Sequence, residues 1–389
     1  MDRLLQMSRW LARDARLLVG NQELFRQFCE KIGVLGVPLD RSWLHLRALH
    51  PQYAGVSRLW TREAGTRETF LDHGFEHTPT YKASTVRFAV EGREPGRWRL
   101  DGTGSLPFPL LEELRTAGYT DYAIAPLLYS TGTANALSWA TRAPRGFADA
   151  GIEFFHDLLP AYAAIAEIKS LRRFVVNVLN TYEGREPGDL ILKGQIQRGD
   201  VRALTAALML VDLRDFTLMS DTMVPTAVIE TLNRYFDCVM PPVAKRGGDV
   251  MEIMGDGILA IFNESTAGGP DEACRQAYEA AREGIEALAR SNLSLPEGAP
   301  QLSAGFALHY GTVAYGNIGS GERLDFTVIG RDVNLTSRIE RLCRELGRSL
   351  IMSGEFVAHL KQPMFEIGHF ALRGFTQMQL LFGPPVESS

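Results

Sequence analysis

Two aspartates, Asp212 and Asp256, stand where their carboxylates could hold a divalent cation. Asp212 follows the apolar run 206–211, which is typical of a buried strand. Asp256 lies in a Gly-Asp-Gly turn between the largely apolar segments 249–253 and 258–262, a pattern that predicts a β-hairpin. Carboxylates at a strand end and a hairpin tip could meet at one magnesium ion, which leaves coordination positions open for phosphate oxygens. Taken singly, a helix cap and a turn residue explain them as well, so the surrounding elements and motifs must decide.

The length and composition of the chain indicate the class of protein that holds these carboxylates. Its 389 residues exceed one ordinary core, so we expect two domains. With 45% hydrophobic and 22% charged residues and a net charge of −5, the composition is that of a soluble globular protein. The sequence has no basic run, no apolar stretch of membrane-spanning length and no signal peptide. We therefore expect a cytoplasmic protein without nucleic-acid or membrane partners, its four scattered cysteines reduced.

The N-terminal part of the chain has all five tryptophans within residues 1–139, which indicates a core of its own. Helical patterns occur at 1–35 and 108–117, and strand patterns at 43–47, 84–90, 97–100, 123–129 and 135–140. Mixed strands closed by helices predict an α+β module over residues 1–155. The order of elements resembles a GAF-type sensory domain, without indicating which small molecule such a domain would bind. The histidines could bind haem or metal, but scattered histidines are more often structural: His45, His50, His73 and His77.

Residues 156–200 are expected to form a helical linker between the two domains. Two sets of residues are spaced seven apart along this segment and are apolar except for one arginine. The first set is Leu158, Ile165, Arg172 and Leu179, and the second is Ala161, Ile168, Val175 and Tyr182. This spacing suits the seam of a parallel coiled coil. Over so few heptads, a long amphipathic helix packed on its own domain explains the pattern equally well, so both interpretations stay open.

The second predicted domain, residues 201–389, has the pattern strand, helix, hairpin, helix, strand, helix and further strands. Helices are expected at 227–244, 271–290 and 332–346, and strand structure at 302–315, with Gly311 marking a turn. Asn334 and Arg338 lie four residues apart on the third of these helices and therefore share one face. In the absence of other motifs, this pair would be interpreted as ordinary helix surface.

Five motifs in the second domain carry a resemblance: residues 211–217, 254–257, 307–319, 326–330 and 333–338. Over about residues 205–383, the chain resembles class III nucleotide cyclases. The resemblance implies a ferredoxin-like catalytic domain that converts a purine nucleoside triphosphate, ATP or GTP, to the 3′,5′-cyclic monophosphate and pyrophosphate. The N-terminal half, through residues 120–122 and 138–140, is similar to the regulatory part of rhizobial-type bacterial adenylate cyclases.

The resemblance gives the opening pair of aspartates a role, since Asp212, Leu213 and Asp256 match the family's metal-binding positions. Two Mg²⁺ or Mn²⁺ ions per site would lower the pKa of the ribose 3′-hydroxyl that attacks the α-phosphorus, and would neutralise charge on the phosphates. The helix expected after the first aspartate begins near Phe216 and Thr217, and its free N–H groups suit a triphosphate.

Three further residues receive roles from the same resemblance. Asn334 orients the ribose, and Arg338 stabilises charge on the α-phosphate in the transition state, for which the fixed fork of an arginine is well suited. Arg373 falls where the family often has a lysine that binds the triphosphate. Because the family takes its metal ligands from one subunit and its Asn and Arg from the other, the resemblance implies a head-to-tail homodimer with two sites at the interface.

Two positions depart from the family pattern. Glu252 stands where the family has a lysine that selects the base. Its carboxylate would accept hydrogen bonds from guanine N1–H and N2–H₂, as in guanylate cyclases. The alternative is that Glu252 is an ordinary hairpin residue. At the partner position, Thr327 resembles the residue found in bacterial adenylate cyclases. The two positions therefore indicate different bases, and the choice between ATP and GTP stays open. Asp215 stands where glycine is usual, and its charge would repel a triphosphate unless Arg214 or a metal compensates. A signal-regulated cyclase is the first interpretation, and a catalytically silent nucleotide-binding protein on the same fold is the alternative.

Overall fold

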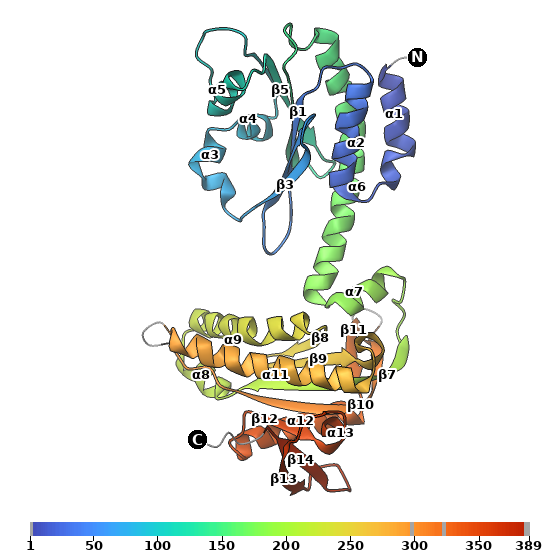
Figure 1. Cartoon of the computed structure of the whole chain (residues 1–389), viewed down its shortest axis with the longest axis vertical. Coiled ribbons are helices and arrows are strands. Elements are labelled where there is room, and N and C mark those ends of the chain that lie inside the picture. Colours follow the sequence, from blue (N-terminus) through green and yellow to red (C-terminus); the bar gives the residue numbers. More distant parts are fainter. Residues whose placement is uncertain (1–2, 296–298, 321–323, 385–389) are drawn as a thin grey trace. The chain divides into compact units, whose positions relative to one another are not determined.

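The computed structural model describes residues 3–295, 299–320 and 324–384. The chain divides into two compact units, residues 1–178 and 179–389 (Figure 1). The linker predicted at 156–200 is shared between them, because most of the long helix α6 (Asp149–Tyr182) belongs to the first unit. Within the described ranges, none of the helices combines the length and the apolar character needed to cross a membrane.

The first unit is built on an antiparallel sheet with strand order β3-β2-β1-β6-β5-β4. Its strands are β1 (Arg41–Arg47), β2 (Gly55–Thr61), β3 (Gly65–Leu71), β4 (Gly96–Arg99), β5 (Asp121–Leu128) and β6 (Ala134–Thr141). One face packs on α1 (Arg3–Arg13), α2 (Gly20–Val34) and α6, and the other on α4 (Thr85–Gly92) and α5 (Pro109–Thr116) (Figure 1). Short turns of helix complete the unit: η1 (Ala15–Leu17), η2 (Phe75–His77) and α3 (Pro79–Lys82). Because successive side chains of a strand point to opposite faces, this sheet supports two separate cores.

Most elements predicted for this unit are confirmed, but the strand predicted at 84–90 is wrong, because these residues form α4. The Ser84 side chain caps the helix by accepting a hydrogen bond from the Arg87 backbone N–H at 3.1 Å. Thr85 and Ala89 are buried four residues apart, as on one face of a helix. The hairpin β2–β3 is missing from the prediction, since polar residues interrupt its apolar alternation.

The second unit contains a sheet in the order β13-β14-β12-β10-β7-β9-β8, with β11 paired to β10. Its strands are β7 (Val201–Leu213), β8 (Asp249–Met254), β9 (Gly257–Asn263), β10 (Ala304–Gly319), β11 (Leu324–Ile329), β12 (Leu350–Ser353), β13 (Phe365–Phe370) and β14 (Gln379–Gly383). β7 pairs with β10 along its whole length and with β9 on its other side. A strand held on both sides is a rigid support for a side chain at its end, and that side chain is Asp212.

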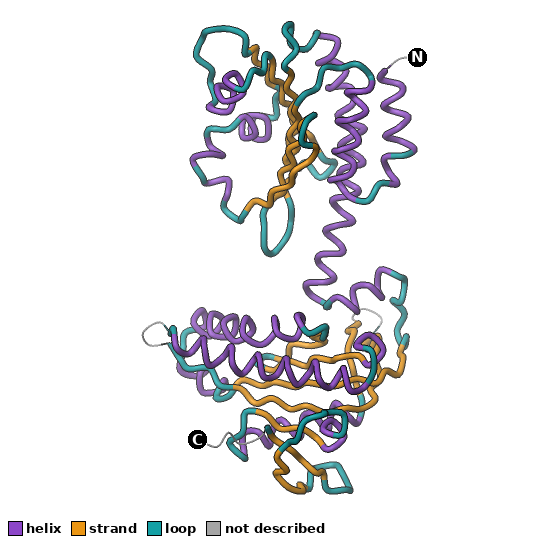
Figure 2. The backbone as a smooth tube through the Cα atoms, in the orientation of Figure 1, coloured by secondary structure: helices purple, strands orange, loops and turns teal. Residues whose placement is uncertain are grey.

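Helices cover both faces of this second sheet. α9 (Pro225–Lys245) and α11 (Pro270–Leu293) pack together on one face (Figure 2). α12 (Arg331–Glu345) packs on the other through Leu335 and Ile339. The shorter helices are α7 (Arg185–Leu192), α8 (Phe216–Thr222), α10 (Glu264–Ala267) and α13 (Gly354–Val357). The three long helices and the strand predicted for this unit are therefore confirmed, and the unit is a mixed helix-and-strand domain. The turn predicted at Gly311 is wrong, because this residue pairs with Ala206 of β7 within the continuous strand β10.

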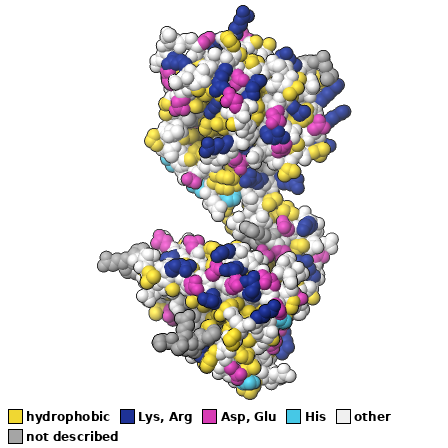
Figure 3. All heavy atoms as spheres, in the orientation of Figure 1, with side chains coloured by type: hydrophobic (Ala, Val, Ile, Leu, Met, Phe, Trp, Pro, Cys, Tyr) yellow, Lys and Arg dark blue, Asp and Glu magenta, His cyan; other side chains and the backbone are white. Residues whose placement is uncertain are grey.

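Charged side chains of both signs are interspersed on the face of the molecule seen in Figure 3. Ion pairs tie the end of α9 to α11, because Lys245 Nζ lies 2.9 Å from a carboxylate oxygen of Glu283 and Arg246 pairs with both Glu283 and Glu279. These ion pairs are partly exposed and individually weak, so burial of the apolar helix faces supplies most of the stability here.

Candidate active site

The end of β7 and the turn between β8 and β9 bring Asp212 and Asp256 together. In the pairing of β7 with β9, Asp212 lies opposite Gly257, the residue that follows Asp256. A Cβ at Gly257 would lie 3.4 Å from Asp212 Oδ1, so the side chain of Asp212 rests on the strand beside it. The two carboxyl groups are close enough for each to influence the pKa of the other. Two aspartates far apart in the sequence thus share one site.

Electrostatics at this pair favour a bound cation. Burial raises the pKa of both carboxyls, and the neighbouring charge of Asp256 raises the pKa of Asp212 further. Arg344 on α12 acts in the opposite direction, with its Nη2 4.0 Å from Asp212 Oδ2. A divalent ion would remove the repulsion between the two carboxylates, which partial burial strengthens.

The donor set at the pair fits a hard divalent ion that also binds phosphate. Within the described residues, no three His, Cys, Asp or Glu side chains are grouped so that they could hold a metal ion. An ion at the aspartate pair would therefore complete its coordination with backbone oxygens, water and phosphate oxygens, as Mg²⁺ does at phosphate sites. The side chain of Leu213 is fully buried in the core under α9 and α11, so only its backbone carbonyl is available as a ligand.

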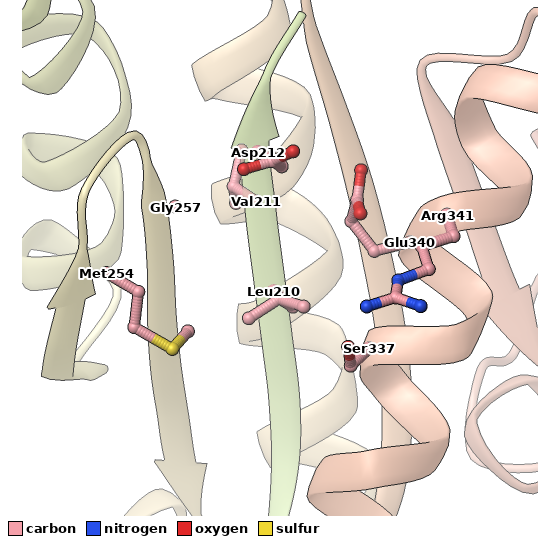
Figure 4. Close-up of a pocket in the computed structure, with 8 residues that line it drawn as sticks. All are labelled: Leu210, Val211, Asp212, Met254, Gly257, Ser337, Glu340 and Arg341. Carbon is pink, nitrogen blue, oxygen red and sulfur yellow. The ribbon is translucent and has the colours of Figure 1, made fainter. Parts of the chain in front are cut away.

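A third carboxylate, that of Glu340 on α12, lines the same cavity as Asp212 and is not among the residues predicted from motifs. A cavity of about 200 Å³ separates α12 from the strands (Figure 4), lined by Leu210, Val211, Asp212, Met254, Gly257, Ser337, Glu340 and Arg341. Gly305 on β10 allows this approach, because a Cβ there would lie 2.9 Å from Glu340 Oε1. The only sequence signal for Glu340 is its position three residues after Ser337, which places both on one helix face.

Glu340 predicts a pH dependence of stability. Burial, followed by the charge of Asp212, raises its pKa from 4.5 to about 7. Because the folded protein binds this proton more tightly than the unfolded chain, the contribution of Glu340 to stability is largest below pH 4.5 and is lost as the pH rises through about 7. In EDTA, Glu340→Gln should reduce the change in the free energy of unfolding between pH 4.5 and about 7 by about 1–2 kcal/mol, after allowance for the partial exposure of the side chain.

The measurement is urea unfolding of the metal-free protein at a series of pH values. Glu345→Gln is the matched control, because Glu345 lies on the same helix with an exposed side chain. If the Glu340→Gln protein keeps the wild-type slope between pH 5 and 7, Glu340 does not carry the predicted proton.

The strands β8 and β11 bring the two predicted base-recognition residues into contact. Thr327 Oγ1 donates a hydrogen bond to Glu252 Oε2 at 3.2 Å. Thr327 is buried and Glu252 half-buried, so the carboxylate is held in one orientation. Its second oxygen is left to accept a hydrogen bond from a ligand.

The helix α12 does not bring Asn334 and Arg338 to the cavity beside Asp212, which other residues of that helix line. Asn334 is exposed and Arg338 half-buried. A single chain therefore presents the aspartate pair and this Asn–Arg pair as two separate groups. Both groups are available to a substrate or to a second subunit.

The remaining predicted residues lie at the surface of the second unit. Phe216 begins α8 and packs partly on the core below α9, and Thr217 beside it is exposed. Arg373 lies in the segment between β13 and β14 and is also exposed. None of the three lines the cavity beside Asp212, so a role in binding phosphate remains a prediction.

The backbone at Asp215 gives a physical reason for the glycine that is usual there. Asp215 has φ 61°, the left-handed region that glycine adopts freely and that aspartate tolerates better than most residues. Its charge is not compensated by Arg214, whose guanidinium donates to the backbone carbonyls of Cys343 and Arg348. The sequence retains the shape of this turn with a charge that the family pattern lacks.

Known proteins similar to this chain include solved structures and curated relatives. The adenylyl cyclase CyaB from P. aeruginosa is 22% identical with a TM-score of 0.42, covering 47% of this chain and 94% of that one. The guanylyl cyclase Cya2 is 28% identical with a TM-score of 0.42, covering 48% and 93%. Adenylate cyclase 1 of Rhizobium meliloti is 30% identical over 212 residues, 53% of this chain and 31% of that protein. The adenylate cyclase of Anabaena cylindrica is 30% identical over 170 residues, 43% of this chain and 33% of that protein.

This chain thus spans about a third of the length of these two curated relatives. Residues 202–381 match the family described as "Adenylate and Guanylate cyclase catalytic domain". The matched segment contains the aspartate pair at the end of β7 together with every residue predicted to bind the nucleotide. Residues 202–381, just under half of the chain, are therefore similar to the family of adenylate and guanylate cyclase catalytic domains.

Proposed function

We propose that this chain converts a purine nucleoside triphosphate to its 3′,5′-cyclic monophosphate and pyrophosphate. The observation that carries the proposal is the strand pairing that places Asp212 beside the turn of Asp256, within the segment that matches the cyclase family. The names of the two relatives, both adenylate cyclases, agree with this reaction class. Incubating the purified protein with each of ATP, GTP, CTP and UTP, with Mg²⁺ or Mn²⁺, tests the proposal.

Each residue of the proposed site has a defined task. Two divalent ions on the aspartate pair would supply the charge that lowers the pKa of the ribose 3′-hydroxyl and neutralises the phosphates. Asn334 orients the ribose, so that the hydroxyl faces the α-phosphorus. The guanidinium of Arg338 binds the α-phosphate oxygens as negative charge develops on them. Arg373 and the backbone at Phe216 and Thr217 bind the outer phosphates, which leave as pyrophosphate.

A homodimer with two sites at its interface is part of the proposal. In one chain the cavity beside Asp212 lacks Asn334 and Arg338, which supports their donation to the site of a second copy. The helix α6 supports pairing of two chains, because the residues of its predicted seam are buried near its start and exposed further along. Leu158 is fully buried in its own unit, whereas Ile168 and Tyr182 are 66% and 78% exposed. We propose that the second half of this seam forms a parallel coiled coil.

The first unit is proposed to regulate the catalytic domain as a GAF-like sensory module. Its antiparallel sheet with helices on both faces supports this proposal. A change in the pairing of α6 could then alter how the two catalytic domains meet.

The choice of base is proposed to depend on Glu252. A carboxylate accepts hydrogen bonds from guanine N1–H and N2–H₂, whereas a lysine donates to adenine N1. We expect Glu252→Lys to shift the ratio of ATP to GTP turnover towards ATP by about tenfold or more, since unpaired polar groups in a site discriminate strongly. The measurement is kcat/KM for both nucleotides. Thr327→Val, which removes the hydrogen bond that orients the carboxylate, should weaken the preference without reversing it. An unchanged ratio in Glu252→Lys would refute the assignment.

A catalytically silent nucleotide-binding protein on the same fold is the second candidate. The uncompensated charge of Asp215 beside α8 favours it, because a carboxylate near the triphosphate opposes binding. The nucleotide assay separates the two candidates. Nucleotide binding without any cyclic product, under all metal conditions, would establish the silent protein.

A further inference from the structure

The strand β1 presents three polar side chains to the face of the first sheet that lies opposite α2 and α6. Leu44 and Leu46 belong to the core formed with those helices. Since side chains alternate along a strand, Arg41, Trp43 and His45 point to the other face. Their partners on β6 share this face, because residues opposite each other in an antiparallel pair point the same way.

Each of these three side chains has a buried polar atom without a hydrogen-bond partner: Arg41 Nη1, Trp43 Nε1 and His45 Nε2. Arg41 and His45 are only 7% and 2% exposed. The other ring nitrogen of His45 contacts Ser57 Oγ at 3.3 Å, which leaves Nε2 as the free one. Buried polar atoms are normally hydrogen-bonded, so three at successive positions of one strand face require an explanation.

The unpaired charge of Arg41 is the strongest of these observations. Three other arginines in the described part of the chain also have an unpartnered buried nitrogen, but each makes another polar contact. Arg58, on β2, forms an ion pair with Glu68 at 2.5 Å. Arg214 and Arg234 donate to backbone carbonyls.

The guanidinium of Arg41 lies over the ring of Trp43, with 5.3 Å from its carbon to the ring centroid. Of the titratable groups that influence Arg41, Tyr122, Tyr119 and Glu113, only Glu113 is charged at neutral pH, and within the described residues none forms an ion pair with Arg41. Burial lowers the pKa of Arg41, which is the expected response of a cation held without an anion. A buried cation of this kind is stable only when an anion approaches it.

Aromatic side chains surround this part of the sheet. Phe75, in η2, lies 5.5 Å from the His45 ring and 5.1 Å from Tyr81, measured between ring centroids. Trp43 and its neighbour Leu59 on β2 are only half-buried. The face is therefore lined with rings and is open to solvent at Trp43.

We propose that this face of β1 binds a small planar organic anion with an aromatic ring and one carboxylate. The carboxylate would accept hydrogen bonds from Arg41 and from Trp43 Nε1, and the ring would pack near His45 and Phe75. A single arginine with no second cation beside it suits one negative charge better than a phosphate dianion. The inference concerns the first unit alone and does not depend on cyclase activity.

Thermal unfolding of the full chain, followed by tryptophan fluorescence, tests the proposal. All five tryptophans lie in the first 139 residues, so the signal reports on the first unit. Benzoate is the probe, and neutral benzamide is its control. Benzoate should raise the unfolding midpoint of the wild type saturably by about 2 °C or more, and benzamide should not.

Two substitutions separate a binding role of Arg41 from a structural one. Without ligand, Arg41→Met should unfold at a higher temperature than the wild type, because it removes an unpaired buried charge. Arg58→Met is the matched control and should unfold at a lower temperature, because it leaves Glu68 buried without its partner. Arg41→Gln keeps a polar side chain of similar length and should also lose the response to benzoate.

A saturable benzoate shift that is absent in both Arg41 variants supports the proposal. An Arg41→Met protein that unfolds below the wild type would show that the charge is structural and would overturn it. The absence of a benzoate shift in the wild type overturns the proposal as well. The same shift in the wild type and in the variants also overturns it, because benzoate would then be an adventitious additive only.

Discussion

Replacing Asp212 with asparagine is expected to lower the rate of cyclisation by about a thousandfold, because the substitution would remove a proposed ligand of the proposed catalytic ions. The same substitution should raise the unfolding temperature of the metal-free protein. Burial and the charge of Asp256 raise the pKa of Asp212, so its ionised form is a cost to the folded state at neutral pH. Loss of activity together with a gain of stability is characteristic of a charge kept for function.

The two halves of this prediction are measured separately. Cyclic product is assayed at saturating nucleotide with Mg²⁺ or Mn²⁺, and thermal unfolding is followed in EDTA. Asp237→Asn makes the same chemical change on α9, where the side chain is exposed, and should alter neither quantity. An Asp212→Asn protein that retains activity would remove Asp212 from the metal site. One that unfolds at a lower temperature would show that its carboxylate is structural.

Mixing two inactive variants is expected to restore activity if the sites lie at a dimer interface. Asp212→Asn damages the metal half of a site, and Arg338→Ala damages the half that binds the α-phosphate. In a mixed dimer one site receives both defects and the other receives neither. With random assortment of subunits, an equimolar mixture should reach about a quarter of the wild-type activity.

The control for this experiment is a mixture of Asp212→Asn with Asp256→Asn. Both substitutions damage the metal half, so every site of every mixed dimer is defective and no activity should return. Subunits must be refolded or expressed together to allow exchange. If the Asp212→Asn and Arg338→Ala mixture stays inactive while mixed dimers are present, all the catalytic residues of one site come from one chain.

Most of the catalytic domain is predictable from local patterns in the sequence. The helices at α9, α11 and α12 follow from apolar residues at helical spacing, and β10 from a largely apolar segment. In the first unit the same reasoning failed at α4, where alternating apolar residues predict a strand. The Ser84 cap and the burial of Thr85 and Ala89 against the sheet favour the helix instead. A short segment with both patterns is decided by its tertiary contacts.

The sequence by itself determined which residues are candidates for the chemistry, because motifs such as the Gly-Asp-Gly turn at Asp256 have a recognisable order and spacing. Only the tertiary structure decided which of these residues meet. Glu340 lines the same cavity as Asp212 because Gly305 on β10 lets α12 lie close. Thr327 contacts Glu252 because two strands distant in the sequence converge. Such meetings depend on sheet register and on the small side chains between elements. Burial and pKa shifts then follow from proximity, which residue spacing along the chain does not encode.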